Sequence, residues 1–345
     1  MNSGARRRMR LFLWFLLCGM LAGAVYGGLV NLTITGRGLV GCLVGAINGA
    51  IITTVIGGTE IFFLASRRGL SVQHAPFLVM FGVKWLLYSL VITAVVVGSL
   101  GERVLGLPPG AATLTPLSLA FSFAATFGFL FIFEMSSIVG RRTLGNIVFG
   151  RYNRPRSEER FFLFVDIAGS TALAERVGPA AVHRFLNGVF RLASGPIDDY
   201  RGEIYQYVGD EMVVTWTVAA GQRDARPIAC LFAIRTALDG AAPRFQREFG
   251  VAPTLRAALH AGPVISGEVG GSKRDIVFHG DVMNTTARLE QATRDLDRPF
   301  IVSADALGRL SDTNRYALEP LGLQTLRGRA APVEVYACSE GRQST

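Results

Sequence analysis

The chain has 345 residues, of which half are hydrophobic and only 18% are charged, and its mean hydropathy is +0.36. These values exclude an ordinary water-soluble globular protein, and the length leaves room for two domains. The formal net charge is +9, but no basic face interleaved with aromatic residues is visible, so anionic lipid suits this charge better than nucleic acid does.

Most of the hydrophobic surplus lies in the first 140 residues. Four apolar stretches occur there, at residues 11–30, 39–65, 75–100 and 115–139. Each is close to, or longer than, the roughly 20 residues that cross a bilayer as a helix. The sequence therefore predicts an all-α transmembrane four-helix bundle over residues 1–140.

Arginines between these stretches predict the orientation of the bundle. Arg6, Arg7, Arg8 and Arg10 precede the first stretch, Arg67 and Arg68 follow the second, and Arg141 and Arg142 follow the fourth, whereas the other two loops have Arg37 and Arg103. Basic loops stay in the cytoplasm, so we expect a multi-pass protein of the inner (plasma) membrane with both termini cytoplasmic. Ala22-Gly23-Ala24 would suit cleavage of a signal peptide, but the three further stretches favour an uncleaved anchor.

Several residues inside the apolar stretches are unusual for a lipid environment. Glu60, Lys84 and Glu134 lie toward the cytoplasmic ends, where the lysine could pair with either glutamate. They are candidates for a signal-sensing role, although pairing between helices or snorkelling explains them equally well. Glycines at spacings of four favour close helix packing in lipid; they are Gly23, Gly27, Gly41, Gly45 and Gly49.

A basic, proline-containing connector over residues 141–160 is expected to lead into a soluble domain over residues 161–345. Residues 161–166 read as a buried strand that ends on Asp166, and residues 167–171 as a loop before a helix that Ser170 or Thr171 could cap. A loop between a strand and a helix N-terminus suits phosphate. The aspartate beside it would repel phosphate unless a divalent cation bridged the two.

A second acid lies at the tip of a predicted hairpin. Residues 203–216 read as two strands joined at Gly209-Asp210. If this hairpin lies beside the strand 161–166, Asp166 and Asp210 reach one edge of a sheet and can hold two metal ions, as in phosphoryl transfer. Each aspartate alone is more often a turn or capping residue. The phosphate-suited loop between them favours the metal-binding interpretation.

The rest of the soluble part alternates strands and helices. Strands are expected at 255–260 and 263–269 with a turn at Gly262, and at 275–278, 300–302 and 333–337; helices are expected at 223–238 and 281–294. This pattern predicts an α+β domain with a largely antiparallel sheet. The sequence has no zinc spacing, no Walker loop and no suggestion of a Ser-His-Asp set.

Four motifs in this order resemble the class III nucleotidyl cyclases, which make cyclic AMP or cyclic GMP. They are Phe164-Val165-Asp166-Ile167 with Gly169-Ser170-Thr171, Val208-Gly209-Asp210, His260-Ala261-Gly262-Pro263-Val264 through Gly267 and Gly270, and Gly280-Asp281-Val282-Met283-Asn284-Thr285-Thr286-Ala287-Arg288. The resemblance covers residues 160–336. It implies a ferredoxin-like core and a homodimer with both active sites at its interface; the membrane bundle would add to that dimer.

The same resemblance implies how metal and phosphate are bound. Asp166 and Asp210 match the acids that hold two Mg²⁺ or Mn²⁺ ions per active site, and the carbonyl of Ile167 is an expected extra ligand. The loop Gly169-Ser170-Thr171 lies where phosphate is expected.

Further matches lie near the end of the chain. Asn284 matches the residue that orients the ribose. Arg288, one helical turn further on the same face, matches the arginine that stabilises charge on the α-phosphate. Arg327 or Arg329 falls where the family often has a lysine that holds the triphosphate.

The purine-reading positions depart from the family pattern. Adenylyl cyclases commonly have Lys, and Asp or Thr, at the positions of Gln206 and Val277, and guanylyl cyclases have Glu and Cys. Gln206 can donate and accept hydrogen bonds and so could read either purine. Asp275 or a backbone group could replace the side chain missing at Val277. ATP is the expected substrate, with GTP as the alternative.

Two other interpretations stay open. Val208-Gly209-Asp210-Glu211-Met212 partly echoes the acidic turn of diguanylate cyclases, but the motif from Asn284 to Arg288 opposes that reading. The missing purine pair instead suggests a catalytically weak nucleotide-binding domain that serves as a receptor output. The intact acids, Asn284 and Arg288 oppose it.

Overall fold

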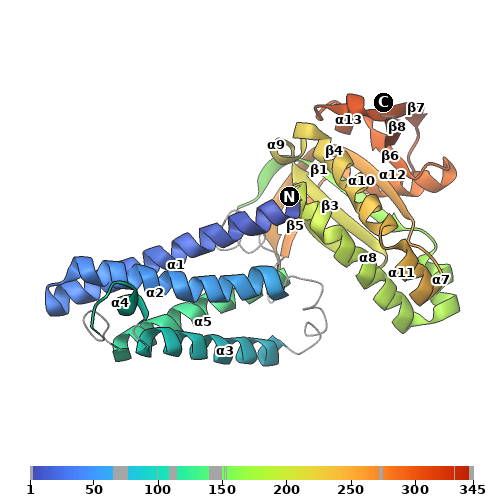
Figure 1. The fold of residues 1–345 in the computed structure, drawn as a ribbon. Coiled ribbons are helices and arrows are strands. Elements are labelled where there is room, and N and C mark those ends of the chain that lie inside the picture. Colours follow the sequence, from blue (N-terminus) through green and yellow to red (C-terminus); the bar gives the residue numbers. More distant parts are fainter. Residues whose placement is uncertain are drawn as a thin grey trace. The chain divides into compact units, whose positions relative to one another are not determined.

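The computed structural model describes residues 3–64, 77–98, 100–108, 115–139, 150, 152, 154–271, 275–329 and 331–341. The chain forms two compact units, Met1–Gly145 and Asn146–Thr345. Figure 1 shows the first as helices alone and the second as a sheet with helices.

The first unit consists of long apolar helices. They are α1 (Ser3–Thr35), α2 (Gly38–Gly58), which continues as the π-helix η1 (Thr59–Leu64), α3 (Phe77–Val97), the short α4 (Leu100–Val104) and α5 (Thr115–Val139). Four segments among the described residues are long and apolar enough to cross a membrane: Met9–Thr33, Gly38–Ile61, Leu78–Val97 and Pro116–Met135. These match the four predicted spans. Arg67, Arg68, Arg141 and Arg142, on which the orientation depends, lie outside the described residues, so the orientation stays a prediction.

Helices α1 and α2 pack through their glycines, as the spacing predicted. A Cβ atom added to Gly23 would lie 2.1 Å from the carbonyl oxygen of Gly45, and one added to Gly27 would lie 2.1 Å from that of Gly41. Neither contact is sterically possible, so a side chain at these positions would push the two backbones apart.

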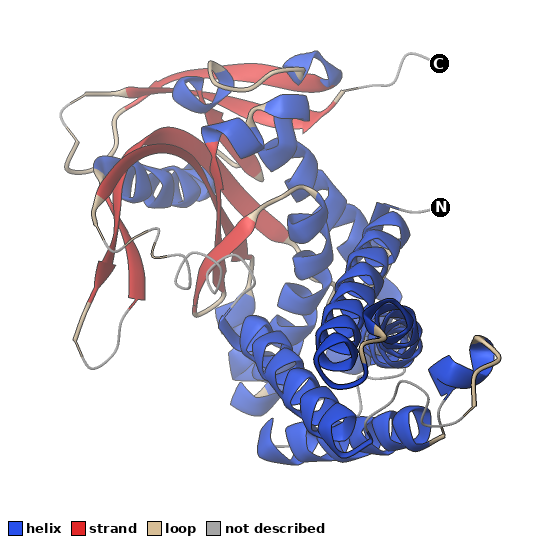
Figure 2. Cartoon of the chain, turned by 90° about the vertical axis from the view of Figure 1, so that its left-hand side faces the viewer, coloured by secondary structure: helices blue, strands red, loops and turns tan. Residues whose placement is uncertain are grey.

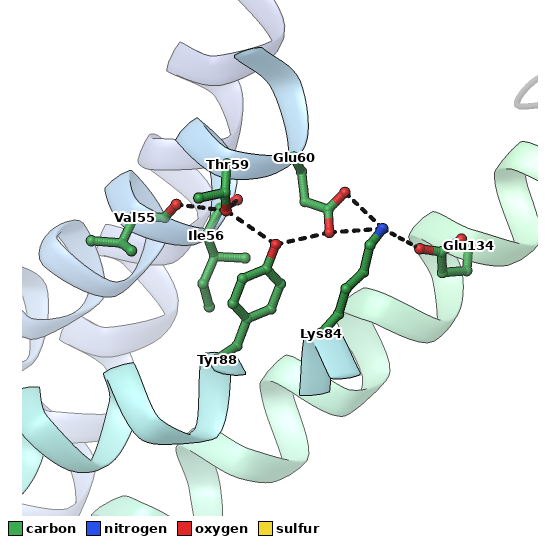
Figure 3. A network of polar contacts seen from close by, with 7 residues as sticks. All are labelled: Val55, Ile56, Thr59, Glu60, Lys84, Tyr88 and Glu134. Carbon is green, nitrogen blue, oxygen red and sulfur yellow. Dashed lines mark hydrogen bonds and ion pairs between the residues drawn. The ribbon is translucent and has the colours of Figure 1, made fainter. Parts of the chain in front are cut away.

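The three ionisable residues of the membrane-type helices form one network (Figure 3). Lys84 Nζ lies 3.1 Å from Glu60 Oε2 and 2.5 Å from Glu134 Oε1, so it joins η1, α3 and α5. The hydroxyl of Tyr88 donates to Glu60 at 2.9 Å and lies 3.0 Å from the hydroxyl of Thr59. The lysine thus pairs with both glutamates, and a sensing role for them stays a prediction.

The second unit is built on an eight-stranded sheet. Its strands are β1 (Arg156–Ile167), β2 (Glu203–Val208), β3 (Glu211–Thr217), β4 (Leu255–Val269), β5 (Asp275–His279), β6 (Phe300–Ser303), β7 (Tyr316–Gln324) and β8 (Val333–Glu340). Their order is β2-β3-β1-β4-β6-β8-β7, and β5 pairs with β4. The described pairs are antiparallel except β4 with β6. An α+β fold with a largely antiparallel sheet is therefore confirmed.

Helices cover both faces of this sheet (Figure 2). They are α7 (Ser170–Val177), α8 (Pro179–Asp199), α9 (Val218–Gly221), α10 (Arg226–Asp239), α11 (Ala242–Phe249), α12 (Asp281–Asp295) and α13 (Ala304–Leu307). Alternate residues of β1 enter opposite cores: Phe161 packs with residues of α8 and α10, whereas Phe162 packs with residues of α12. Because residues 161–165 of β1 are buried on both faces, this part of the strand is a continuous apolar run. Full burial of each phenylalanine contributes about 2–3 kcal/mol.

Two local predictions were wrong. The predicted turn at Gly262 does not exist, because β4 runs unbroken past it and pairs with β1 from Leu255 to Ser266. Helix α12 packs over this position, where a Cβ would lie in ordinary contact with Val282, 3.4 Å away. The strand expected from residue 161 already begins at Arg156, inside the predicted connector. Helices α8 and α11 and strand β7 were not anticipated.

His260 of β4 makes the stability of this unit sensitive to acid. Its side chain is buried, its Nδ1 lies 2.7 Å from the hydroxyl of Ser303, and burial lowers its pKa to about 4. The unfolded chain binds a proton near pH 6.5, whereas the folded chain does not. The free energy of unfolding of this unit should therefore fall by about 2 kcal/mol between pH 6.5 and pH 5, and should not rise further above pH 7.

Thermal melting of the detergent-solubilised chain at several pH values checks this expectation. His260→Asn keeps a group that can hydrogen-bond to Ser303 but does not titrate. Between pH 7 and pH 5, the melting temperature of this variant should therefore fall by about 5 °C less than that of the wild type. Equal slopes for both chains would contradict the assignment.

Candidate active site

Asp166 and Asp210 meet at one edge of the sheet, as predicted. Asp166 is the second-last residue of β1, is buried, and pairs in register with Glu211 of β3. Asp210 occupies the β2–β3 turn beside Gly209, whose φ of +63° suits a tight hairpin. The pKa of Asp166 is raised, first by burial and then by the charge of Asp210. The pairing of Asp166 with Glu211, the residue that follows Asp210, brings the two aspartates to the same end of the strands.

The loop after β1 contacts the second acid. The hydroxyl of Ser170 donates to Asp210 Oδ2. Ser170 or Thr171 was expected to cap the helix, and this was wrong: Gly169 is the N-cap of α7, with φ of +77°, and no side chain bonds there. The left-handed conformation favours glycine, which moves Ser170 into the first turn and frees its hydroxyl for the aspartate. Ile167 buries its side chain, so a metal could use its backbone carbonyl alone.

Two further carboxylates that the motifs did not reveal surround Asp166. Glu211 has its pKa raised to about 7, chiefly by burial and then by the charges of Glu290, Asp166 and Asp210. Glu290 of α12 is also buried, and its pKa is raised chiefly by burial and then by Asp166. Glu211 follows Asp210 directly, which is the one sequence signal that could have identified it.

Arginines offset part of this negative charge. Arg294 Nη2 lies 3.0 Å from Asp166 Oδ2, and Arg256 pairs with Asp166 in the strand register. The four carboxylates still outnumber the two arginines. Hard carboxylate oxygens in excess are a donor set that suits Mg²⁺ or Mn²⁺. Within the described part of the chain, however, no three His, Cys, Asp or Glu side chains are already arranged as a complete metal site.

The second group of predicted residues lies on the N-terminal part of α12. Asn284 is exposed and Arg288 is half-buried, one turn apart. The Leu326-Arg327-Gly328-Arg329 loop lies against them, because a Cβ at Gly328 would be 3.4 Å from Arg288 Nη2. Arg329 donates to Thr285 Oγ1 at 2.9 Å. Arg327 is exposed, so of the two predicted arginines it is the better placed to reach a ligand.

One chain does not bring these two groups together. Arg294 touches Asp166, and Asn284 precedes it by ten residues, or about 15 Å along the helix axis. The face with Asn284 and Arg288 is also turned by about 120° from the face with Glu290 and Arg294. The acids and the Asn284–Arg288 pair therefore form two separate half-sites.

The predicted purine positions lie on β2 and β5. Gln206 is exposed on β2, Val277 is half-buried on β5, and Asp275 begins β5, where it accepts a hydrogen bond from the amide of Ile276. The rings of Tyr205 and Phe278 lie 5.0 Å apart. The two strands therefore approach each other, and a base could meet both.

Three comparisons relate the chain to known proteins. The family described as "Adenylate and Guanylate cyclase catalytic domain" matches residues 153–339. "Adenylate cyclase 2" of Rhizobium meliloti is 38% identical over 226 residues, which are 66% of this chain and 62% of the relative. "Adenylate cyclase 1" of the same organism is 25% identical over 185 residues, or 50% of this chain and 26% of the relative.

The chain thus spans less than two thirds of the length of either curated relative. Among solved structures, the adenylyl cyclase CyaB from P. aeruginosa is 20% identical, with a TM-score of 0.47, over 56% of this chain and 99% of that one.

Proposed function

This chain belongs to the family of class III adenylate and guanylate cyclase catalytic domains, and from that premise we propose that it converts ATP to 3′,5′-cyclic AMP and pyrophosphate. The observation that carries the proposal is the meeting of Asp166 and Asp210 at one sheet edge beside the loop that opens α7. This edge combines hard metal ligands with the N-terminus of a helix, which suits a phosphate.

Each residue has a chemical task in this reaction. Two Mg²⁺ or Mn²⁺ ions, held by Asp166, Asp210 and the Ile167 carbonyl, would lower the pKa of the ribose 3′-hydroxyl and neutralise phosphate oxygens. The backbone N–H groups of Gly169-Ser170-Thr171 face the phosphates. The 3′-oxygen forms a bond to the α-phosphorus, the bond from that phosphorus to the bridging oxygen breaks, and the hydroxyl proton passes to solvent.

Residues of α12 and the following loop complete the machinery. Asn284 holds the ribose for in-line attack. Arg288 meets the negative charge that develops on the α-phosphate. Arg327 binds the triphosphate, and Arg329 supports it by fixing the loop to Thr285. Because these residues and the acids lie in separate half-sites of one chain, we infer that a second copy supplies the missing half and that the enzyme is a homodimer.

The four apolar helices support a membrane location. We infer a multi-pass protein of the inner membrane with both termini in the cytoplasm, a connector that begins at residue 141 and ends before β1, and a catalytic domain that begins with β1. Single cysteines placed in the inter-helix loops and labelled with a membrane-impermeant maleimide would test the orientation. Labelling from the outside at residue 67 or 141 would contradict it.

Choice of purine is expected to depend on Gln206. Its amide can face either base, whereas a glutamate only accepts and suits the N–H groups of guanine. Gln206→Glu should therefore shift the ratio of kcat/KM for ATP over GTP toward GTP by about 10- to 100-fold, since an unpaired polar edge costs 1–3 kcal/mol. Steady-state kinetics with both nucleotides measure this ratio.

Gln246→Glu is a matched control for that substitution. Gln246 lies on α11, where its amide donates to the carbonyl of Gly250, far along the chain from the purine positions. Gln246→Glu should leave the ratio of kcat/KM for ATP over GTP unchanged. An unchanged ratio in Gln206→Glu as well would remove Gln206 from purine recognition.

The overall proposal is tested with the purified, detergent-solubilised chain and Mn²⁺ or Mg²⁺, given ATP and GTP in separate reactions. Cyclic AMP from ATP is the expected product. Cyclic GMP from GTP alone would keep the mechanism and change the substrate. Nucleotide binding without any cyclic product would favour a receptor output domain, for which the lack of a hydrogen-bonding side chain at Val277 is the supporting observation.

A further inference from the structure

Arg294 lies between two carboxylates of the acidic cluster. Its Nη2 is 3.0 Å from Asp166 Oδ2 and 3.8 Å from Glu290 Oε1. The first distance is a hydrogen-bonded ion pair and the second is too long for one. The Glu290 oxygen is buried and has no hydrogen-bond partner among the residues that the structure describes. A second acceptor for the guanidinium, at 3.8 Å, thus lies only about 0.6 Å beyond the usual hydrogen-bonding range.

The three side chains differ in their freedom to move. The side chain of Arg294 is 55% exposed, whereas those of Asp166 and Glu290 are 8% and 6% exposed. The carboxylates are held by a central strand and by the packed face of α12. The arginine, a long side chain at the last turn of that helix, can change partner without moving either of them.

Charge gives a reason for such a change. A divalent ion on Asp166 and the guanidinium would compete for the same carboxylate, and their like charges repel at that distance. Glu290 offers the displaced guanidinium an acceptor one helical turn before Arg294, an i,i+4 spacing that suits an ion pair.

We propose that Arg294 is a tethered counter-cation that occupies Asp166 when no divalent ion is bound, competes with such ions for this carboxylate, and moves to Glu290 when they bind. This inference rests on the proposed function, because it takes Asp166 as a metal ligand. Arg294 would then lower the affinity of the site for metal ions. Glu290 would restore part of that affinity, because it accepts the guanidinium that the metal displaces from Asp166. Arg294 is a positioning residue here and takes no part in the bond changes.

Binding of Mn²⁺ to the detergent-solubilised full-length chain, without nucleotide, tests the proposal. Electron paramagnetic resonance of the unbound ion gives the affinity without any need for turnover. Arg294→Gln should bind Mn²⁺ about three- to tenfold more tightly, because a half-exposed, charge-assisted pair is removed. Arg294→Lys keeps the charge and should stay close to the wild type.

A double-mutant cycle tests the role of Glu290. Glu290→Gln should weaken Mn²⁺ binding in the wild-type background, since the guanidinium loses its second acceptor and stays on Asp166. In the Arg294→Gln background most of that weakening should disappear. If Glu290→Gln weakened Mn²⁺ binding equally in both backgrounds, Glu290 would act only through its own charge. That result would overturn the proposed movement of Arg294 from Asp166 to Glu290.

Arg309→Gln is the matched control. Arg309 makes a two-pronged ion pair with Glu159, at 3.1 and 3.2 Å, near the other end of β1. Glu159 is seven residues before Asp166, or about 23 Å along the strand. This variant loses the same charge and should bind Mn²⁺ as the wild type does.

The outcomes separate the two proposals. Normal binding by the wild type with no gain in Arg294→Gln overturns the competition and leaves the cyclase proposal intact. A gain of equal size in Arg309→Gln shows a general effect of net charge and also overturns it. Failure of every chain to bind Mn²⁺, the wild type included, overturns the metal site and the competition together.

Discussion

Co-expression of two inactive variants, Asp210→Ala and Arg288→Ala, should restore about a quarter of the wild-type cyclase activity. Random pairing of equal amounts makes half of the dimers mixed, and one of the two sites in each mixed dimer then contains neither substitution. The expectation follows from the geometry of α12. Arg294 at its end touches Asp166, whereas Arg288 lies on another face and closer to the N-terminus of the helix.

Each variant expressed alone is the first control and should be inactive. The second control combines both substitutions in one chain and co-expresses it with the Arg288→Ala chain. Every site in that pair lacks Arg288, so no activity should return. No recovery in the first pair would mean that one chain supplies all of its own catalytic residues, and recovery in the second would mean that the reaction does not need Arg288.

Replacing Asp210 with asparagine should lower the cyclase rate by on the order of a thousandfold, because the site loses one of its two predicted metal-binding charges. The amide keeps the shape of the side chain and still accepts a hydrogen bond from Ser170. Folding of the hairpin should therefore be unaffected. Cyclic AMP formation at saturating Mn²⁺, together with far-ultraviolet circular dichroism, measures both effects.

Asp312→Asn is a close control for this substitution. Asp312 is also an aspartate next to a turn, and its carboxylate, like that of Asp210, accepts a hydrogen bond from a serine, Ser311. It has no role in the proposed reaction, so the rate should stay within twofold of the wild type, as surface substitutions usually cost little. A comparable loss in both variants would indicate that turn structure, and not metal binding, explains the result.

The sheet edge with Asp166 and Asp210 was predictable from sequence because its signals are local. An apolar run that ends on Asp166 marks a strand buried on both faces, and Gly209-Asp210 marks a hairpin turn. The continuous course of β4 was not predictable, because Gly262 resembles a turn residue. The strand continues there because Gly262 pairs with Arg160 of β1, a contact between distant parts of the chain.

The acidic cluster escaped prediction for a similar reason. Glu290 and Arg294 resemble an ordinary exposed i,i+4 pair on a helix, which is the commonest role for such a spacing. Only the packing of α12 on the sheet buries Glu290 and brings Arg294 to Asp166. The features of the membrane-type helices, in contrast, were predictable because the rules for them are local. The length of the apolar stretches predicted the spans, and the glycine spacing predicted the close contact between α1 and α2.

If the four apolar helices span a membrane, as proposed above, the network around Lys84 has a consequence for how the protein is made. Synthesis delivers Glu60 first, then Lys84, and Glu134 last, each on a different helix. A single charged side chain costs about 2.5–3.5 kcal/mol during insertion when it lies at the centre of a helix, and less toward the helix ends, where these three residues lie. Once α3 has emerged, the lysine can neutralise Glu60, and the half-made bundle is acceptable to the bilayer. Helix α5 is inserted last, and its Glu134 then pairs with a lysine that already contacts Glu60. Correct packing of α5 therefore depends on the earlier Glu60–Lys84 pair. A chain with a misassembled α2–α3 pair would leave Glu134 unpaired in lipid, a mark by which membrane quality-control proteases could recognise the failed product.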